Sequence, residues 1–403
     1  MVNTTTYKSE QKPRTPWYRL LFHPIIAVIC IVLGLILASI ALNVKSFNPV
    51  KNAMADFETS DIFYQSLIST GERDSSTYIT IVDMTELYAR ADIAVCLDEI
   101  MQHNPSVVGI DAVFQGLRED SLADMLLAGI CEAYDNIITN CYVINPNDTA
   151  DRFDDMERAY FREGTPMPYI ANDSDITTRE CSTWMPREMY GQGTKRKLQL
   201  CYDVQGGLVA SMPWIVASRF VKEPIAKPST RNVVINYQPT RFPVLQPDEV
   251  AQHPELIEGH IVLFGSMNDI QDRHNTPIGA MSGLEVLAYA TQTLLLQNEG
   301  KPLEGFWMYV LTFLLVVLNS WVYTAYMKTL GKVRPDLLQL ILKMSYFKML
   351  NLFIWMGFWL WVFMQVFEHF NVLVNPTAAF GFWALTPYAN EFYKLFFERN
   401  KTA

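Results

Sequence analysis

The chain has 403 residues, of which 50% are hydrophobic and only 18% are charged, and its mean hydropathy is +0.08. This composition is too apolar for an ordinary soluble enzyme. The apolar residues collect at 25–42 and again in the last quarter of the chain, while the middle is polar. We therefore expect an integral membrane protein with one large soluble domain inserted after its first span.

The first apolar run is a charge-free stretch from Ile25 to Leu42, with basic residues before it and Lys45 after it. It is long enough to cross a hydrocarbon core as a helix. A cleaved signal peptide is the alternative, but the polar leader is long and no small-x-small cleavage site follows the run. We predict a retained anchor at 25–42, preceded by a cytoplasmic segment at 1–24.

Further apolar runs follow the soluble domain and predict three more membrane helices within 306–390. The last run contains Pro376 and Pro387. Three polar side chains within these runs, Asn319, Ser320 and Gln365, can form hydrogen bonds between helices or to a partner. Because none of them is charged, a packing role is the default interpretation. The three predicted spans lie at 306–327, 348–367 and 372–390.

The loop at 328–348 carries five basic residues against one acid, Asp336. By the positive-inside rule this loop is cytoplasmic, as is the basic amino-terminal segment. The inserted domain at 43–305 then lies outside the cytoplasm, and the short tail at 391–403 lies inside. We expect a multi-pass protein of a bacterial inner membrane, with its large domain in the periplasm.

The charge of the inserted domain limits its partners. Residues 43–304 contain 20 Lys and Arg against 37 Asp and Glu, a formal charge of −17. Because nucleic acids are polyanions, we expect no nucleic-acid partner. Membrane lipid and other proteins are the expected partners.

Five of the six cysteines fall in the inserted domain. An oxidising compartment allows some of them to pair. Cys181 and Cys201 flank a polar stretch typical of a hairpin turn, so we predict a disulfide between them. At least one of the five stays free or bonds elsewhere, and Cys96 has the pattern of a buried helical residue.

Strand-like and helix-like patterns alternate within the domain, which predicts right-handed βαβ units and a mostly parallel sheet. The fold class is therefore an α/β extracytoplasmic domain joined to a four-helix transmembrane region, one helix before it and three after it. The stretch 145–200 breaks the rhythm and is expected to be an irregular excursion. Predicted strands lie at 78–82, 106–110, 136–143, 233–237 and 260–264, and predicted helices at 86–102, 122–134 and 284–296.

Several motifs across the domain match one known family. The main ones are Ile81-Val82-Asp83, Pro105-x-x-Val108-Gly109-Ile110-Asp111, Gly259-His-Ile-Val-Leu-Phe-Gly265, Asp272-Arg273-His274-x-Thr276-Pro277-Ile-Gly279 and Ser282-Gly283-Leu-Glu285. Together these motifs resemble the CHASE2 family of extracytoplasmic sensor domains. The resemblance covers essentially the whole domain, and one helix before the domain with three after it is the usual pattern of that family.

The resemblance implies a sensor that binds a ligand or a protein outside the cytoplasm. Members of the family generally continue from the last membrane helix into a cytoplasmic cyclase, histidine kinase or protein kinase. Only Glu391–Ala403 follow the last predicted span here. We therefore expect the output to be supplied by a partner, which is an envelope complex, a cytoplasmic protein or a second copy of the chain.

Polar side chains at or just beyond the carboxyl ends of predicted strands form the candidate ligand site, since open parallel sheets bind ligands there. The alternative is that these side chains cap helices or stabilise turns. In particular, Asp272 and His274 are expected to be hydrogen-bond partners rather than metal ligands, and Thr276 to fix a turn. The predicted site residues are Asp83, Asp111, Ser266, Asp269 and Asp272, with His274, Thr276 and Glu285 from the closing motifs.

The sequence contains no GxxxxGK[ST] loop, HExxH helix or GxSxG elbow. We therefore expect neither an enzyme nor a resident cofactor or metal. Three hypotheses follow, namely a transmembrane sensor or signalling subunit, a structural scaffold of an envelope complex, and, third, an enzyme acting on an envelope substrate.

Overall fold

The structure is a computed structural model that describes residues 21–43, 58–70, 74–112, 114, 121–140, 181–182, 194–204, 207–270, 272–332 and 345–398. The chain divides into two compact units. One is the α/β unit, Ser60–Lys301, and the other is the helical unit, Met1–Thr59 with Pro302–Ala403.

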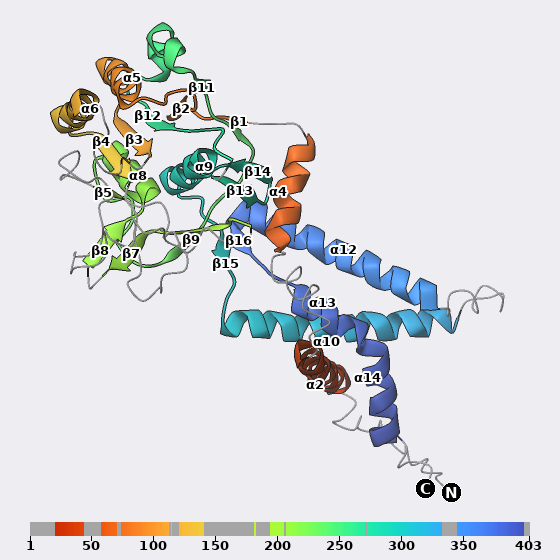
Figure 1. Ribbon diagram of the computed structural model, residues 1–403. Coiled ribbons are helices and arrows are strands. Elements are labelled where there is room, and N and C mark those ends of the chain that lie inside the picture. Colours follow the sequence, from red (N-terminus) through yellow and green to blue (C-terminus); the bar gives the residue numbers. More distant parts are fainter. Residues whose placement is uncertain are drawn as a thin grey trace, which may run out of the picture. The chain divides into compact units, whose positions relative to one another are not determined.

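Within the described part of the α/β unit, six strands form a parallel sheet in the order β11-β2-β12-β3-β4-β5 (Figure 1). Although β12 is the last of the six in the sequence, it lies between β2 and β3. The central strands are buried along nearly their whole length, as strands covered on both faces must be. The strands are β2 Ile79–Asp83, β3 Val107–Asp111, β4 Ile137–Asn140, β5 Cys181–Ser182, β11 Val244–Leu245 and β12 Ile261–Gly265.

Helices α5 (Arg90–Gln102) and α6 (Ser121–Ala133) pack together and share a core with alternate side chains of the sheet, including Val108 and Phe264. Two 3-10 helices, η3 and η4, continue this layer. A buried ion pair between Arg90 and Asp124 joins α5 to α6. The 3-10 helices are η3 Pro247–Gln252 and η4 Pro254–Leu256.

Helices α8 (Met212–Val221) and α9 (Gly283–Leu296) pack together, and they contact β3 and β12 respectively. Helix α9 packs closely against β12 because Gly265, at the end of β12, has no side chain. A Cβ at that position would lie 2.9 Å from Cδ1 of Leu284. Helix α4 (Thr59–Thr70) is held by an ion pair from Asp61 to Arg196.

Short paired strands complete the described α/β unit. β1 pairs with β10 in parallel, and three antiparallel pairs are β6 with β9, β7 with β8, and β13 with β14. Their bounds are β1 Asp74–Ser75, β6 Lys197–Gln199, β7 Cys201–Val204, β8 Gly207–Ala210, β9 Asn232–Val234, β10 Thr240–Arg241, β13 Arg273–Thr276 and β14 Gly279–Ser282, and β15 covers Lys301–Pro302.

The parallel α/β architecture predicted from the sequence is confirmed. Four of the five predicted strands are members of the sheet, as β2, β3, β4 and β12. The fifth, predicted at 233–237, is β9, which pairs with β6 outside the parallel sheet. Strand β11 and helix α8 lie where no element was predicted, and most of the stretch 145–200 is outside the described residues.

The predicted disulfide is wrong, because Cys201 carries a free, buried thiol. The prediction rests on the polar stretch between the two cysteines, which has the pattern of a hairpin turn. In the structure Cys181 begins β5 and pairs with Thr139 of the parallel sheet, whereas Cys201 begins β7 and pairs with Ala210. The two cysteines therefore belong to different sheets.

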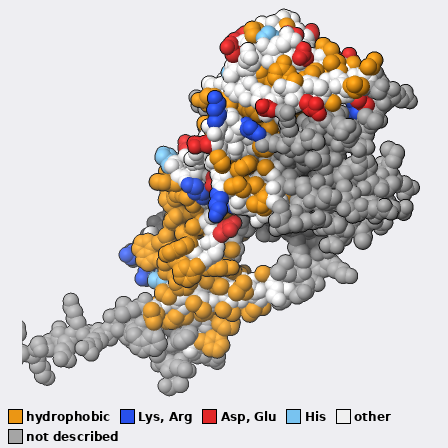
Figure 2. Space-filling view, turned by 90° about the vertical axis from the view of Figure 1, so that its left-hand side faces the viewer, with side chains coloured by type: hydrophobic (Ala, Val, Ile, Leu, Met, Phe, Trp, Pro, Cys, Tyr) orange, Lys and Arg blue, Asp and Glu red, His pale blue; other side chains and the backbone are white. Residues whose placement is uncertain are grey.

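The helical unit contains three described helices that are long and apolar enough to cross a membrane, within α2, α10 and α12. Hydrophobic side chains gather on the exposed face of these helices, as a lipid-facing surface requires (Figure 2). The described elements are α2 Phe22–Asn43, α10 Phe306–Leu330, α12 Ser345–Phe370, β16 Val372–Leu373, α13 Thr377–Ala384, α14 Thr386–Tyr393 and a π-helix, η5, at Lys394–Glu398.

The fourth predicted span is not a continuous helix. Its residues form α13 and α14, each of 8 residues, which meet at Leu385. Eight helical residues rise only about 12 Å, much less than a hydrocarbon core of about 30 Å. Pro376 lies directly before α13, and Pro387 lies in the first turn of α14, where a missing N–H is tolerated.

Polar side chains join the helices of this unit. Nδ1 of His23 lies 3.0 Å from Oγ of Ser320, and Nδ2 of Asn319 donates to Oγ1 of Thr386 at 2.8 Å. The interhelical hydrogen bonds that the sequence allows for Asn319 and Ser320 are thus present. Gln365 instead donates to Glu368 within α12.

Candidate functional site

Two of the predicted site acids lie at the same edge of the sheet, one strand apart. Gly265, the last residue of β12, is the register partner of Asp83 on one side and of Asp111 on the other. The carboxyl ends of β2, β12 and β3 are therefore aligned. Ser266 follows directly and brings the loop after β12 to the same edge.

Asp83 is fully engaged in holding two loops together. Its Oδ1 accepts hydrogen bonds from the backbone N–H groups of Thr85 and Met267, each at 3.0 Å, and from the Thr85 hydroxyl. The Thr85 hydroxyl lies 3.0 Å from that of Ser266. Because Asp83 is buried and its partners are protein groups, this half of the edge stabilises turns.

Thr276 and Glu285 also have local structural partners. Thr276 Oγ1 donates to the carbonyl of Gly279 at 2.6 Å and accepts from the backbone of Ile278, which fixes the turn between β13 and β14. Glu285 accepts from the backbone N–H of Ser282, whose hydroxyl accepts from the backbone of Glu285. This reciprocal capping box defines the start of α9.

Asp272 lies at that same helix start. Its backbone carbonyl accepts from the N–H of Gly283 at 2.9 Å, and its Oδ1 lies 3.0 Å from Nε2 of buried His274. A Cβ on Gly283 would fall 2.1 Å from Oδ2 of Asp272, so any larger residue there would displace this carboxylate. The carboxylate therefore occupies the positive end of the helix dipole. The backbone carbonyl of Asp269, a residue exposed in the preceding loop, accepts a hydrogen bond from the backbone N–H of Asp272.

Among the described carboxylic acids, Asp111 has the largest pKa shift. Burial and, to a lesser extent, the negative charge of Asp272 raise its pKa, a hydrogen bond from Asn140 opposes them, and the resulting pKa is about 7. Nδ2 of Asn140 donates to Oδ1 of Asp111 at 3.1 Å. A carboxyl with such a pKa exchanges its proton near neutral pH, which is common at functional sites.

Two further side chains interact with these acids, Asn140 with Asp111 and Lys195 with Asp272. Oδ1 of Asn140 is buried and has no hydrogen-bond partner in the part of the chain that the structure describes. Burial lowers the pKa of Lys195, while the charge of Asp272 acts in the opposite direction. Asn140 was predicted only as part of a strand, and Lys195 lay in the stretch without periodicity. A polar residue at the end of a buried strand was the available signal for Asn140.

The candidate site is therefore narrower than the predicted one. We define the acid-pair site as Asp111, Asp272, His274, Asn140 and Lys195. It combines hydrogen-bond donors and acceptors with an exchangeable proton, which suits the binding of a polar ligand. Among the described residues no three His, Cys, Asp or Glu side chains are grouped to hold a metal ion.

The CHASE2 domain profile matches residues 28–322, which is most of the chain. The chain belongs to the CHASE2 family. The match extends beyond the α/β unit into α2 before it and α10 after it, so the flanking helices are part of the CHASE2 pattern. CHASE2 domains are extracytoplasmic sensory domains. Comparisons with curated proteins and with solved structures found no match.

Proposed function

We propose that this CHASE2 protein is a non-enzymatic transmembrane sensor or signalling subunit. Its CHASE2 domain binds a ligand or protein outside the cytoplasm, and partner proteins supply the output. The observation that carries the proposal is the position of the acid-pair site at the start of α9. Only residues 297–305 separate the end of α9 from the start of α10, the next span.

This connection gives a route from the site to the membrane. A ligand that contacts Asp111 or Asp272 acts on the amino end of α9. It shifts the domain between two arrangements only if it binds one of them more tightly. A displacement of α9 then acts on α10 through the short link, and the loop that follows α10 carries the signal to a partner.

We further propose that the protein lies in a bacterial inner membrane with both termini in the cytoplasm. In this arrangement α13 and α14 together form the fourth, discontinuous span. Broken helices are tolerated in a membrane where they are buried in protein. Nε1 of Trp383 in α13 donates to the carbonyl of Leu315, and Thr386 of α14 accepts from Asn319, which supports this burial.

A scaffold of an envelope complex is the second candidate function. Four predicted site residues, Asp83, Ser266, Thr276 and Glu285, have local partners that stabilise loops, turns and the start of α9. A rigid domain of this kind suits an interaction platform that does not switch.

Copurification from native membranes separates the two functions. Partners are quantified with wild type, with Asp272→Ala, and with Asp248→Ala, at an exposed acid in η3, as a matched control. The sensor proposal expects altered partner association for Asp272→Ala alone, with the domain still folded by its melting transition. A stoichiometric complex that forms equally with all three proteins contradicts the sensor and favours the scaffold.

A further inference from the structure

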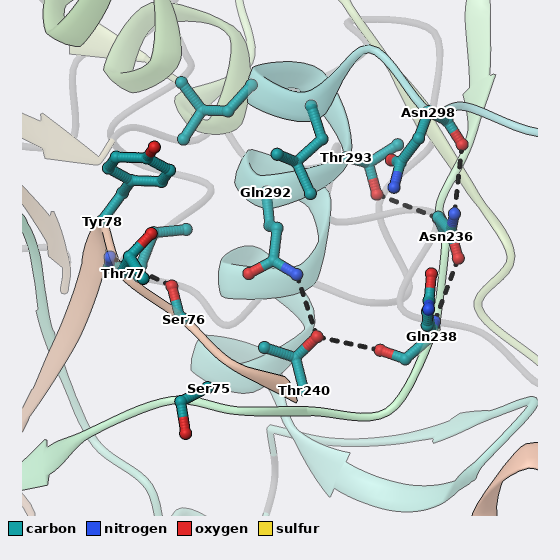
Figure 3. A pocket seen from close by; sticks show the side chains of 13 residues that line it. Ser75, Ser76, Thr77, Tyr78, Asn236, Gln238, Thr240, Gln292, Thr293 and Asn298 are labelled. Atoms are coloured by element: carbon teal, nitrogen blue, oxygen red, sulfur yellow. Dashed lines mark hydrogen bonds between the residues drawn. The ribbon is translucent and has the colours of Figure 1, made fainter. Parts of the chain in front are cut away.

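A cavity of about 130 Å³ lies at the amino-terminal end of β2, the end opposite to Asp83 (Figure 3). Its walls come from three segments of the α/β unit. These are the approach to β2 at 75–79, the extended segment at 236–240, and the carboxyl-terminal half of α9 with the turn after it, at 292–298. The cavity is thus separate from the acid-pair site but shares α9 with it.

The residues that line the cavity carry no formal charge, and they offer both polar groups and apolar surface. Ten of the thirteen lining residues have a neutral hydroxyl or amide side chain, and the other three are aliphatic. An ionic ligand would lose its hydration here without gaining a countercharge, which is costly. A neutral ligand with hydroxyl groups avoids this cost and can combine polar contacts with apolar ones. The ten are Ser75, Ser76, Thr77, Tyr78, Asn236, Gln238, Thr240, Gln292, Thr293 and Asn298.

A chain of hydrogen bonds fixes one wall before any ligand binds (Figure 3). Nε2 of Gln292 donates to Oγ1 of Thr240 at 2.9 Å, and that hydroxyl donates to the carbonyl of Gln238 at 3.0 Å. The Gln238 backbone N–H donates to Oδ1 of Asn236, whose own side-chain amide donates to the carbonyl of Asn298. Because these side chains are already oriented, little entropy is lost when a ligand binds.

One acceptor in the wall is left without a partner. Oδ1 of Asn298 is buried and has no hydrogen-bond partner among the described residues. Buried polar atoms are nearly always satisfied, so an orphan of this kind calls for a group that is supplied from outside the chain. A hydroxyl of a bound ligand is such a group.

Tyr78, a residue that is 48% exposed, adds an aromatic ring, which contacts Phe220 edge-on with 5.8 Å between the ring centroids. An aromatic ring offers a flat apolar surface beside polar groups, which matches the C–H face of a sugar ring. The cavity volume is several times the roughly 30 Å³ that one water occupies in the liquid. It is well below the several hundred Å³ of a typical drug site, which fits a single ring.

We propose that this cavity binds an uncharged sugar, either a free monosaccharide or the terminal residue of a glycan. The proposal rests on the sensor function only for its consequence, since binding itself is independent of signalling. A bound sugar contacts Gln292 and Asn298 at the end of α9 that leads into residues 297–305 and α10. The ligand would therefore act on the helix that also carries the acid-pair site.

The test is saturation-transfer NMR on the full-length protein in nanodiscs, which avoids detergents with sugar headgroups. Methyl β-glucoside and N-acetylglucosamine are the neutral probes, and glucuronate is the charged counterpart. Gln238→Ala and Asn298→Ala alter the cavity, and Gln252→Ala changes an exposed glutamine elsewhere in the domain as a matched control. Melting transitions verify that each variant is folded.

We expect at least one neutral sugar to bind wild type and Gln252→Ala equally, and to bind each cavity variant at least about tenfold more weakly. Glucuronate is expected to bind at least about tenfold more weakly than the best neutral sugar. The proposal is overturned if neither neutral probe binds at millimolar concentration, if folded cavity variants bind like wild type, or if glucuronate binds equally well. If a sugar binds but partner association does not change, the sugar site stands and only the sensor function is contradicted.

Discussion

The side-chain amide of Asn140 donates a hydrogen bond to the carboxyl group of Asp111, with an N···O distance of 3.1 Å. This contact lowers the pKa of Asp111, but burial and the charge of Asp272 outweigh it and leave the pKa at about 7. A group with a raised pKa resists the loss of its proton on going from acid to neutral pH. Asp111 thus couples the stability of the domain to pH.

Asp111→Asn should flatten the pH dependence of stability. Between about pH 4 and pH 7, wild-type Asp111 keeps a proton that the unfolded chain loses, so the free energy of unfolding falls as pH rises through this window. Asparagine does not titrate, so the variant does not lose this part of its stability as pH rises. Because part of Asp111 is exposed, we expect Asp111→Asn to be more stable than wild type at pH 8 by roughly 1–3 kcal/mol. Denaturant unfolding at pH 5 and pH 8 measures this, and an unchanged slope in the variant contradicts the assignment.

Asp83→Ala should destabilise the folded domain. The substitution removes the acceptor shared by the N–H groups of Thr85 and Met267 and by the Thr85 hydroxyl. Leaving buried donors unpaired costs about 1–3 kcal/mol. Asp83→Asn keeps an Oδ1 acceptor and is the matched control, with a smaller expected loss. Equal melting temperatures for wild type and Asp83→Ala would show that this network contributes nothing.

Two ion pairs of different exposure give a paired test of burial. Arg196 and Asp61 form two hydrogen bonds, at 2.9 and 2.6 Å, with side chains only 10% and 13% exposed. Arg231 pairs with Glu299 but is 50% exposed. We expect Arg196→Ala to cost about 3–5 kcal/mol and Arg231→Ala less than about 1 kcal/mol. Urea unfolding of both variants decides, and similar losses would refute the distinction.

We predict that the basic loop at 328–348 sets the orientation of the protein in the membrane. A reporter fused after Lys332 is expected to behave as cytoplasmic, because positive loops stay inside. A reporter fused within 145–175 is expected to behave as exported. Paired phosphatase and fluorescent-protein fusions measure both positions. The reverse pattern would overturn the orientation and, with it, the sensor proposal.

Local patterns predicted most of the sheet and the position of its acids. Apolar runs that end at Asp83 and Asp111 predict buried strands with carboxylates at one edge, and the structure has both. The register could not be predicted, because the insertion of β12 between β2 and β3 depends on long-range pairing. For the same reason, nothing local distinguished Asp83, which also accepts a hydrogen bond from Met267 in a distant loop, from Asp111.

The parts of the site that were missed depend on tertiary structure. Lys195 reaches the surroundings of Asp272 because its backbone N–H donates to the carbonyl of Asn275 in β13, a contact between distant segments. The cavity draws on three segments that share no motif. In the membrane region, Pro376 and Pro387 marked the weak fourth span, but hydropathy could not show that it divides at Leu385.

We propose that ligand binding to the CHASE2 domain changes which partner proteins contact the loop that follows α10. The most direct measurement is quantitative cross-linking of loop lysines, such as Lys328 and Lys332, in intact membranes with and without the neutral sugar that binds wild type best. Asn298→Ala, treated identically, is the control for direct effects of the sugar. We expect the sugar to change the yield of cross-links between the loop lysines and partner proteins by at least about threefold in wild type, and to leave it unchanged in Asn298→Ala. Cross-links that stay constant in wild type while the same membranes bind the sugar would contradict it.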